Sequence, residues 1–401
     1  MNKKKYSGYK SYQYLEAGKD YKTFKLAKQV KRVAPYELEL TEAEQKRVEK
    51  IFDENFVISA HEHPRILPED IGELTEMNSL GREYTGYEGL SVSGMDAVFD
   101  NFLDGSCIIT SKHGWKWNDI LYNLGMKYCD VAHQDMYVRA ENVEDIKKAK
   151  ENGQVALITS LESSTMIENE VDRIDILYGF GVRCMGIVYS ESNSLGTGLR
   201  EKGDGGLTKF GEQAVERMNK IGMAIDVSHA SDQTCLDVIE KSDYPIFINH
   251  AGARSLWDIN RLKPDEVIKA CAKKGGVIAV EAAPHTTITE NHREHSLESV
   301  MEHFEYIVDL VGIDHVTFGP DTNFGDHVAL HDEFRKFLSI DQMEKNKTPN
   351  HPKVDYVAGL DNPSENFHNI IGWFVKHGYS NDEIAKAVGG NTMRLLDEVW
   401  V

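Results

Sequence analysis

The stretch Ala224-Ile-Asp-Val-Ser-His229 and, one helix length later, Ile246-Phe-Ile-Asn-His250 decide the fold. Each is a short, mostly apolar segment that ends on a histidine, which is typical of a buried parallel strand with a polar group at its carboxyl end. Three further segments end on metal-binding residues: His61 with His63, Glu162, and Asp321. Because every strand of a parallel α/β barrel ends at the same face, we expect these side chains to converge in one mouth.

Strands and helices alternate regularly between residues 141 and 318. Segments with strand-like composition lie at 56–60, 107–110, 155–161, 183–189, 223–227, 245–249, 277–281 and 315–318. Helical segments lie between them at 141–151, 172–178, 209–220, 231–241, 263–274 and 297–310, several of them ended by glycine. Eight strands in repeated βα units predict an α/β fold, a closed (β/α)8 TIM-type barrel; a doubly wound sheet is the alternative.

The regions on either side of this alternation are predicted additions to the barrel. Residues 1–40 are expected to form an arm that packs on the surface or is partly disordered, and a capping signature at Thr41 begins a helix that runs to about Asp53. Residues 65–105 look like a long excursion after the first strand, and 326–362 like a polar loop followed by two terminal helices, near 365–376 and 381–399. We therefore divide the chain into an N-terminal arm and helix, 1–54, and a barrel domain with C-terminal helices, 55–401.

Composition and charge limit the classes of partner and compartment. The formal net charge of −20 disfavours nucleic acid and anionic membrane surfaces, because phosphates would be repelled. The five cysteines are scattered without a CxxC pair, and the basic N-terminus has no apolar segment behind it, so we expect a cytoplasmic protein. No stretch approaches the ~20 apolar residues that span a bilayer. The sequence leaves open whether the protein forms a homo-oligomer.

The polar strand ends have the composition of a metal centre. His61 and His63 are two residues apart, so both imidazoles point to one face of a strand. His229 and His250 end neighbouring strands and suit a second ion. Two divalent ions, most simply zinc, need an anionic bridge to sit ~3.5–4 Å apart, which is the role expected of Glu162. A single such histidine more often makes a structural hydrogen bond, but the recurrence at several strand ends favours metal binding.

Further polar residues are candidates for proton transfer and substrate binding. Asp321 could be a metal ligand, cap the following segment, or stay free and shuttle protons to the leaving group. Arg254 and Arg261 lie in one loop, where one could grip a substrate carboxylate bidentately while the other holds the loop. Tyr189 and Ser190, at the end of the strand 183–189, are substrate-binding candidates. Five loop histidines without ligand spacing are expected at the surface: His285, His292, His295, His327 and His331.

The chain resembles the renal, or membrane, dipeptidase family, whose members are amidohydrolase-type (β/α)8 barrels with a binuclear zinc site. The resemblance spans roughly 155–396 and is carried by Asp226-Val-Ser-His229-Ala-Ser, Asn249-His250-Ala-Gly-Ala-Arg254, Arg261-Leu-Lys-Pro-Asp265, His315-Val-Thr-Phe-Gly-Pro-Asp321, Gly359-Leu-Asp-Asn-Pro-Ser-Glu-Asn-Phe367 and Gly389-Gly-Asn-Thr-Met-Arg394. It implies that His229 and His250 bind one ion and that Glu162 bridges to the other. It also implies that Arg261 holds the substrate carboxylate and that Asp321 shuttles protons.

Three positions depart from the family pattern. The first strand carries His61-x-His63 where the family usually has His-x-Asp, an exchange of an anionic ligand for a neutral one that should make bound water more acidic. The residues Ser-Ser-Thr follow Glu162 where the family has Gly-Gly-His or similar. The segment 189–193, Tyr-Ser-Glu-Ser-Asn, lacks the histidine with which the family contacts its substrate.

The leading functional hypothesis is a metal-dependent hydrolase that cleaves a small amide such as a dipeptide, by attack of a metal-bridging hydroxide. The missing histidine leaves open a related barrel that acts on another small amide or a lactone, or that catalyses a non-hydrolytic elimination. A non-catalytic binding protein is disfavoured, because buried polar strand ends without a function would cost free energy. The expected partner is a small carboxylate-bearing molecule.

Overall fold

A computed structural model describes residues 4–102, 116–337 and 352–400 of the chain. In this part of the chain, nine strands form one sheet in which every pairing is parallel. Eight follow each other in the order β1-β2-β4-β5-β6-β7-β8-β9, and β3 pairs only with β4. The strands are β1 Ile58–Glu62, β2 Ala97–Phe102, β3 Tyr137–Arg139, β4 Val155–Leu161, β5 Val182–Gly186, β6 Ala224–Asp226, β7 Phe247–Ala251, β8 Val277–Val280 and β9 Val316–Phe318.

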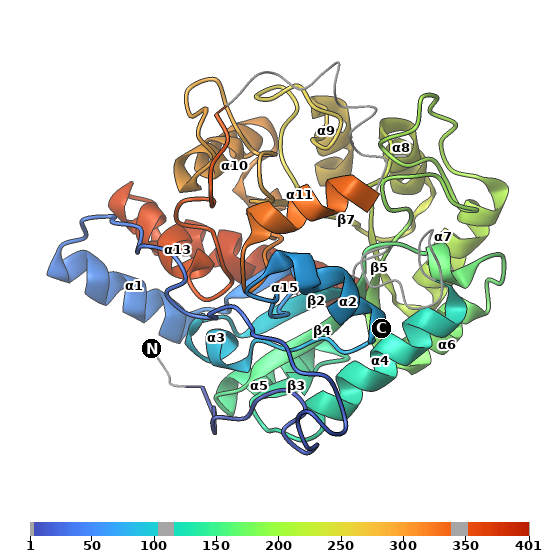
Figure 1. The fold of residues 1–401 in the computed structure, drawn as a ribbon. Coiled ribbons are helices and arrows are strands. Elements are labelled where there is room, and N and C mark those ends of the chain that lie inside the picture. The colour runs from blue at the N-terminus through green and yellow to red at the C-terminus, as the bar shows by residue number, and fades with distance from the viewer. Residues whose placement is uncertain (1–3, 103–115, 338–351, 401) are drawn as a thin grey trace.

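The chain after β9 returns to β1 and brings the two ends of the sheet together. The amide of Asp321 donates to the carbonyl oxygen of His61 at 3.1 Å, and the amide of His63 donates to the carbonyl oxygen of Thr322 at 3.0 Å. The sheet thus curls into a nearly closed barrel with helices outside it (Figure 1). The predicted (β/α)8 TIM-type barrel is confirmed.

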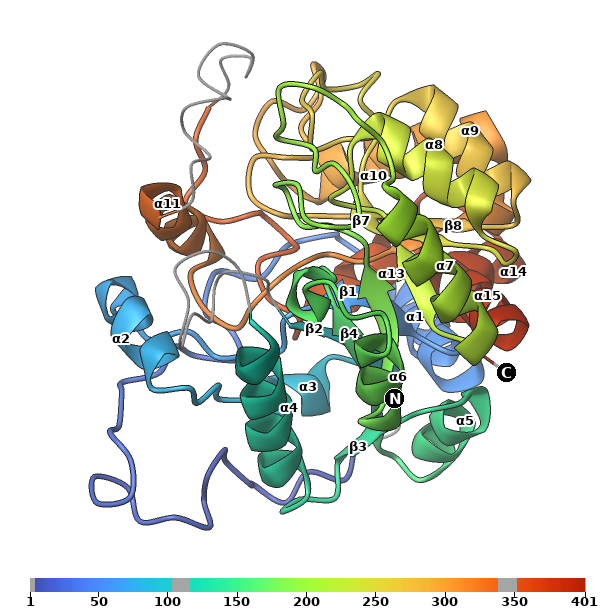
Figure 2. The ribbon, with the colours of Figure 1, turned by 90° about the vertical axis from the view of Figure 1, so that its right-hand side faces the viewer.

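Helices surround the barrel and cover its outer face. Figure 2 shows α7, α8 and α9 on one flank of the sheet. The α-helices are α1 Glu42–Glu54, α2 Leu74–Ser79, α3 Tyr87–Val92, α4 Trp117–Val131, α5 Val143–Glu151, α6 Arg173–Gly179, α7 Lys209–Ile221, α8 Asp232–Lys241, α9 Asp265–Lys273, α10 Leu297–Val311, α11 His327–Phe337, α13 Asn366–Lys376, α14 Asn381–Ala385 and α15 Asn391–Val399.

Local sequence signals explain where several of these helices begin and end. Thr41 forms the predicted capping box with Glu44 at the start of α1, and Ser231 caps α8 through the amide of Thr234. Gly222 ends α7 in the left-handed conformation, with φ of 75°, which glycine adopts without steric cost. The helices predicted between residues 141 and 310 are all present, with ends that differ by a few residues.

Two layers of apolar side chains hold the barrel. One lies between the sheet and the surrounding helices, and a smaller one includes Phe99 of β2 and Phe247 of β7, whose rings meet edge to face at 5.5 Å. Both rings are fully buried, and burial of such a side chain contributes roughly 1.5–3 kcal/mol. The interior of the barrel is therefore a packed core, and a functional site can form only at the ends of the strands.

The structure corrects the sequence prediction in the first third of the barrel. The strand predicted at 107–110 lies outside the described residues, and the second strand, β2, lies inside the predicted excursion 65–105. Its Ala-Val-Phe-Asp-Asn-Phe sequence looks too polar for a buried strand. Asp100 is nevertheless accommodated, because Lys127 of α4 pairs with it at 2.7 Å and the Tyr137 hydroxyl donates to it at 3.1 Å.

Two further corrections concern the C-terminal part. The predicted polar loop 326–362 contains α11. The predicted helix 381–399 is divided into α14 and α15 by a wide turn, Lys386–Gly390. Gly389 in this turn lies so close to the segment before β1 that an added Cβ would stand 2.3 Å from the carbonyl oxygen of Phe56.

The N-terminal arm lies along the barrel surface and is anchored to it by charged groups. The Lys4 ammonium contacts Asp96 at 2.8 Å, and the Arg32 guanidinium grips the Asp361 carboxylate with two hydrogen bonds of 2.7 and 2.8 Å. Tyr12 of the arm is buried, and its hydroxyl donates to the carbonyl oxygen of Glu83 at 2.7 Å. The arm therefore packs on the surface, one of the two predicted outcomes, while the division into 1–54 and 55–401 stays a prediction. Among the described residues, every helix is too short or too polar to cross a membrane.

Candidate metal centre

Five strand ends deliver the predicted side chains to one place. His61 lies in β1 and His63 one residue beyond its end, while Glu162 follows β4 directly. His250 lies near the end of β7. His229 and Asp321 each lie three residues beyond their strands, β6 and β9. All six residues are buried, so the barrel mouth gathers them away from bulk water.

The Glu162 carboxylate lies at the centre of this cluster. Its Oε1 is 3.5 Å from Nε2 of His61, 3.3 Å from Nε2 of His229 and 3.4 Å from Nε2 of His250. Two sets of ligand atoms share it: His61, His63 and Glu162 form one, and Glu162, His229 and His250 form the other. A single carboxylate common to two ligand sets is the arrangement expected of a bridge.

Hydrogen bonds on the far side of the imidazoles fix which nitrogen faces the centre. His63 Nδ1 lies 2.7 Å from the carbonyl oxygen of Asn101, which can only accept, so Nδ1 carries the proton. The Oδ1 of Asn249 accepts hydrogen bonds from Nδ1 of His61 at 3.2 Å and from Nδ1 of His250 at 2.5 Å. The Nε2 atoms of these three rings are therefore unprotonated when the rings are neutral.

Converging lone pairs require a cation between them. The Nε2 atoms of His61 and His63 are 3.2 Å apart, and those of His229 and His250 are 2.9 Å apart. Burial lowers the pKa of His61 to about 4 and holds those of His229 and His250 well below their usual value, so the rings stay neutral at pH 7. Neutral imidazoles and a carboxylate facing one point fit a divalent transition-metal ion of the zinc type.

Asp321 stands on the His61–His63 side of the cluster. Its Oδ1 lies 3.0 Å from Nε2 of His63 and 3.5 Å from Nε2 of His61, and its carboxylate forms a third set of ligand atoms with His61 and His250. Asp321 has a φ of 58°, a left-handed conformation that non-glycine residues rarely adopt and that surrounding contacts must hold. Its position suits either of its two predicted chemical roles, metal ligand or proton carrier.

Glu62, between the two histidines of β1, holds this segment from behind. Its Oε2 accepts hydrogen bonds from the amide and the hydroxyl of Thr322, both at 2.8 Å, and its Oε1 accepts one from the Asn366 amide at 3.1 Å. Burial raises the pKa of Glu62 to about 8. The carboxylate thus joins β1 to the residue that follows Asp321 and to α13.

The two arginines of the loop after β7 have different surroundings. Arg254 grips Asp232 with hydrogen bonds of 2.5 and 2.9 Å and donates to three carbonyl oxygens of its own loop. Arg261 instead reaches the metal cluster, where its Nη2 donates to the carbonyl oxygen of His250 at 3.0 Å. The same Nη2 lies 2.5 Å from the Glu281 carboxylate. Arg254 therefore holds the loop, and Arg261 faces the site.

Glu281 is a site residue that the sequence reasoning missed. It directly follows β8 and is fully buried, and burial raises the pKa of its carboxyl group to about 7. The signal was present in the sequence, because Glu281 ends the apolar segment 277–281 just as Glu162 ends 155–161. What the sequence could not show is its partner, since Arg261 lies twenty residues earlier in another loop.

Tyr189 and Ser190 both contact His229. The Tyr189 ring stacks on the His229 imidazole with centroids 4.2 Å apart, and the Ser190 hydroxyl lies 3.1 Å from His229 Nδ1. Their role in substrate binding stays a prediction. The contacts indicate a second role, which is to orient the His229 imidazole. Three of the loop histidines predicted at the surface are instead buried: His285, His295 and His327.

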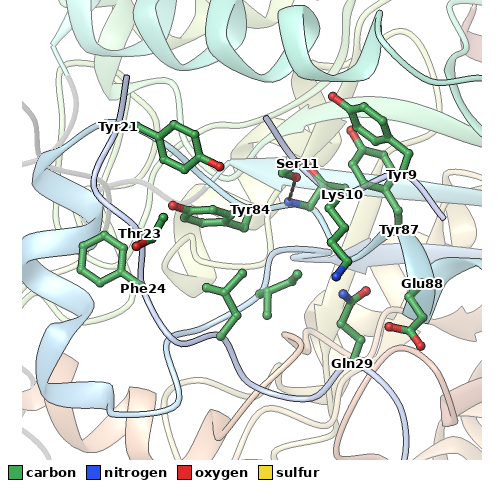
Figure 3. Close-up of a pocket in the computed structure, with 13 residues that line it drawn as sticks. Tyr9, Lys10, Ser11, Tyr21, Thr23, Phe24, Gln29, Tyr84, Tyr87 and Glu88 are labelled. Atoms are coloured by element: carbon green, nitrogen blue, oxygen red, sulfur yellow. Dashed lines mark hydrogen bonds between the residues drawn. The ribbon is translucent and has the colours of Figure 1, made fainter. Parts of the chain in front are cut away.

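A separate cavity of about 320 Å³ lies between the N-terminal arm and the segment after β1. Figure 3 shows Tyr21 and Phe24 of the arm on one side, Tyr84 in the middle, and Tyr9 of the arm beside Tyr87 on the other side. None of the candidate metal ligands lines this cavity, so it is not part of the candidate site.

Comparison with known proteins assigns the family. A sequence model described as membrane dipeptidase (peptidase family M19) matches residues 121–336, which is more than half of the chain. The matched part includes the candidate site residues from Glu162 to Asp321. Dipeptidase verJ from Clonostachys rogersoniana is 26% identical over 283 residues, which are 70% of this chain and 63% of that relative.

Solved structures agree on the fold. An amidohydrolase from Pseudomonas aeruginosa superposes with a TM-score of 0.71 at 22% identity, over 88% of this chain and 99% of that one. A metallo peptidase from Rhodobacter sphaeroides, solved with a phosphinate mimic of the dipeptide L-Ala-D-Ala, gives a TM-score of 0.64 at 16% identity, over 86% of this chain and 99% of that one. The chain belongs to the membrane dipeptidase family, peptidase family M19.

Proposed function

We propose that the protein is a metal-dependent hydrolase that cleaves a small amide, most simply a dipeptide. Membership of a metallopeptidase family supports metal dependence. The observation that carries the proposal is the Glu162 oxygen placed within 3.5 Å of three histidine Nε2 atoms from three strands. We infer two divalent ions, most simply zinc, held by His61, His63, Glu162, His229 and His250.

The residues of the chain divide the work of such a reaction. When bound, divalent ions lower the pKa of water and polarise a carbonyl oxygen. Asn249 and the Asn101 carbonyl keep the unprotonated nitrogens of three imidazoles aimed at the centre. We propose that Asp321 accepts a proton from the attacking water and passes it to the leaving amine. Arg261 is proposed to contact the end of the substrate remote from the cleaved bond, and Tyr189 and Ser190 are proposed to border the bound substrate beside His229.

A second candidate is the same barrel acting on a different small amide or a lactone, or catalysing an elimination. It is favoured by the segment 189–193, which lacks the family's substrate-contacting histidine. It is also favoured by the Arg261–Glu281 pair, because the guanidinium already has an anionic partner. Both candidates use the same metal centre, and they differ in the substrate or, for an elimination, in the type of reaction.

Metal content and turnover test the proposal together. Protein purified without chelator should contain about two divalent ions per chain by elemental analysis, and it should release alanine from L-Ala-D-Ala, the dipeptide mimicked in the Rhodobacter sphaeroides structure. A chelator should abolish turnover and a divalent ion should restore it. A metal content well below one per chain that supplementation does not change would overturn the proposal. Cleavage of N-acyl amino acids or lactones in place of dipeptides would select the second candidate.

A further inference from the structure

The pair formed by Arg261 and Glu281 sets the chemical character of one end of the site. Glu281 is fully buried, and the Arg261 side chain is 11% exposed. One amino group of the guanidinium, Nη2, is used up, because it donates both to Glu281 Oε2 and to the carbonyl oxygen of His250. A ligand that reaches Arg261 therefore meets a compensated charge and not a free cation.

Each residue of the pair has a further polar atom. Arg261 Nη1 and Glu281 Oε1 are both buried, and within the described part of the chain neither makes a hydrogen bond of good geometry. The Thr286 hydroxyl lies near the Glu281 carboxyl group and lowers its pKa, but it donates its proton to the carbonyl oxygen of Ala283. A buried donor or acceptor left unpaired costs about 1–3 kcal/mol, so such atoms in a binding site indicate the groups that a ligand supplies. Here the ligand must offer one acceptor to Nη1 and one donor to Oε1.

We propose that Glu281 makes this end of the site selective for a primary carboxamide over a carboxylate, an inference that rests on the proposed function. A primary carboxamide presents a carbonyl oxygen and an N–H on the same edge, which matches one donor of Arg261 and one acceptor of Glu281, two groups held together by the Nη2–Oε2 contact of 2.5 Å. A carboxylate offers acceptors alone and would bring a second negative charge to Glu281. The substrate class is then a dipeptide or amino-acid derivative whose carboxyl end is amidated.

An internal peptide group cannot replace the terminal amide. In a trans peptide the N–H and the C=O point to opposite sides, so a single edge does not carry both. The pair therefore selects an amide at the end of the molecule and disfavours a longer chain that continues through this point.

Two peptides that differ only at this end test the inference. The kcat/KM of the metal-loaded protein is compared for L-Ala-D-Ala and for L-Ala-D-Ala-NH2, with release of L-alanine as the common readout. We expect the amide to be favoured by at least about tenfold, because one charge-assisted hydrogen bond is gained and a like-charge contact is avoided. A preference for the free acid would overturn the inference.

Glu281→Gln should reverse the preference. The glutamine amide can turn its oxygen to Arg261 Nη2, which leaves an N–H donor where Oε1 was an acceptor, and a donor suits a carboxylate. We expect the amide-to-acid ratio of kcat/KM to fall by at least about tenfold. Glu302→Gln is the matched control, because that carboxylate binds Thr289 and Asn291 of the loop after β8 without contacting Arg261. An unchanged ratio in Glu281→Gln, or an equal fall in Glu302→Gln, would overturn the inference.

Direct binding separates this inference from the proposed function. Calorimetry with D-alaninamide and D-alanine reports on the pair even when neither peptide is cleaved. Tighter binding of D-alaninamide to the unsubstituted protein, lost in Glu281→Gln, supports the inference. Tighter binding of D-alanine overturns it. If neither peptide is cleaved but D-alaninamide still binds more tightly than D-alanine, the result counts against the proposed function and not against this inference.

Discussion

Two walls of the same barrel mouth differ in how their buried charged and polar groups are compensated. The wall formed by the ends of β1, β4, β6 and β7 gathers unprotonated nitrogens and a carboxylate around one point, with Nε2 atoms of neighbouring rings 2.9 to 3.2 Å apart. The wall formed by the loop after β7 and the end of β8 pairs a guanidinium with a carboxylate at 2.5 Å. The first arrangement is stable only around a cation, whereas the second is nearly neutral by itself.

The difference separates reaction from recognition. Unprotonated nitrogens and a carboxylate that converge on one point are suited to bind a cation that the protein itself does not supply. The Arg261–Glu281 pair is compensated in charge and has one donor and one acceptor without a hydrogen bond. It can therefore only select a ligand by its hydrogen-bonding pattern. We therefore expect changes in the first wall to abolish metal binding and turnover, and changes in the second wall to alter which substrate is used.

The largest effect should follow loss of a ligand in the first wall. His229→Ala or His250→Ala should remove one metal ion and lower kcat by ~10³-fold or more, because several kcal/mol of transition-state stabilisation are lost. The barrel should stay folded, since these residues lie at strand ends and outside the packed core. Elemental analysis and circular dichroism check both points. Full metal content and full activity in either variant would refute the assignment of the ligands.

Asp321→Asn should have the next largest effect and leave the metal in place. Asparagine cannot carry the proton, so kcat should fall by ~10²–10⁴-fold, the range typical of general acid–base catalysis. Metal analysis of the variant separates the two roles that the geometry allows. Loss of an ion would make Asp321 a ligand, and the proton carrier would have to be sought elsewhere in the mouth.

Much of the first wall was predictable from the sequence, and most of the second was not. His61, Glu162, His229 and His250 each end or closely follow an apolar segment, so their convergence follows from strand direction alone. Glu281 carries the same local signal, but its meaning depends on a contact with Arg261 that only the folded chain creates. A local pattern can place a residue at the mouth without showing its partner.

The same limit explains the errors in the fold. Strand β2 was missed because Asp100 and Asn101 make it look polar, and the groups that permit the burial of Asp100, Lys127 and Tyr137, come from distant parts of the chain. The regular second half of the barrel was predicted well because its strands are apolar and its helices carry local capping signals, as at Ser231. Position in the barrel is thus a local property, whereas burial of a charge depends on long-range pairing.

The two arginines of the second wall offer a matched comparison. Arg261→Ala should lower kcat/KM by about 10–200-fold through loss of a charge-assisted hydrogen bond, and Arg261→Lys should recover only part, because an ammonium cannot reproduce the planar guanidinium. Arg254→Ala should lower Tm slightly and change kcat/KM by less than about threefold, since its partners belong to its own loop and to Asp232. Equal losses in both alanine variants would mean that Arg261, too, only shapes the loop.

The smallest effect should come from behind the first wall, at Thr322. Its hydroxyl and amide both donate to Glu62, and this contact helps to hold Asp321 in its left-handed conformation. Thr322→Val keeps the shape of the side chain and removes two hydrogen bonds of about 0.5–1.5 kcal/mol each, the one donated to Glu62 and the one accepted from the Asn366 amide at 2.9 Å. Only the part of this energy that acts on Asp321 should reach the reaction, so kcat should fall about two- to tenfold while KM and metal content stay unchanged. Thr322→Ser should restore kcat, because it restores the hydroxyl. A serine variant as slow as the valine variant would mean that packing of the methyl group matters and the hydrogen bonds of the hydroxyl do not. Loss of metal in Thr322→Val would instead show that the segment supports the ligands and not the proton carrier alone.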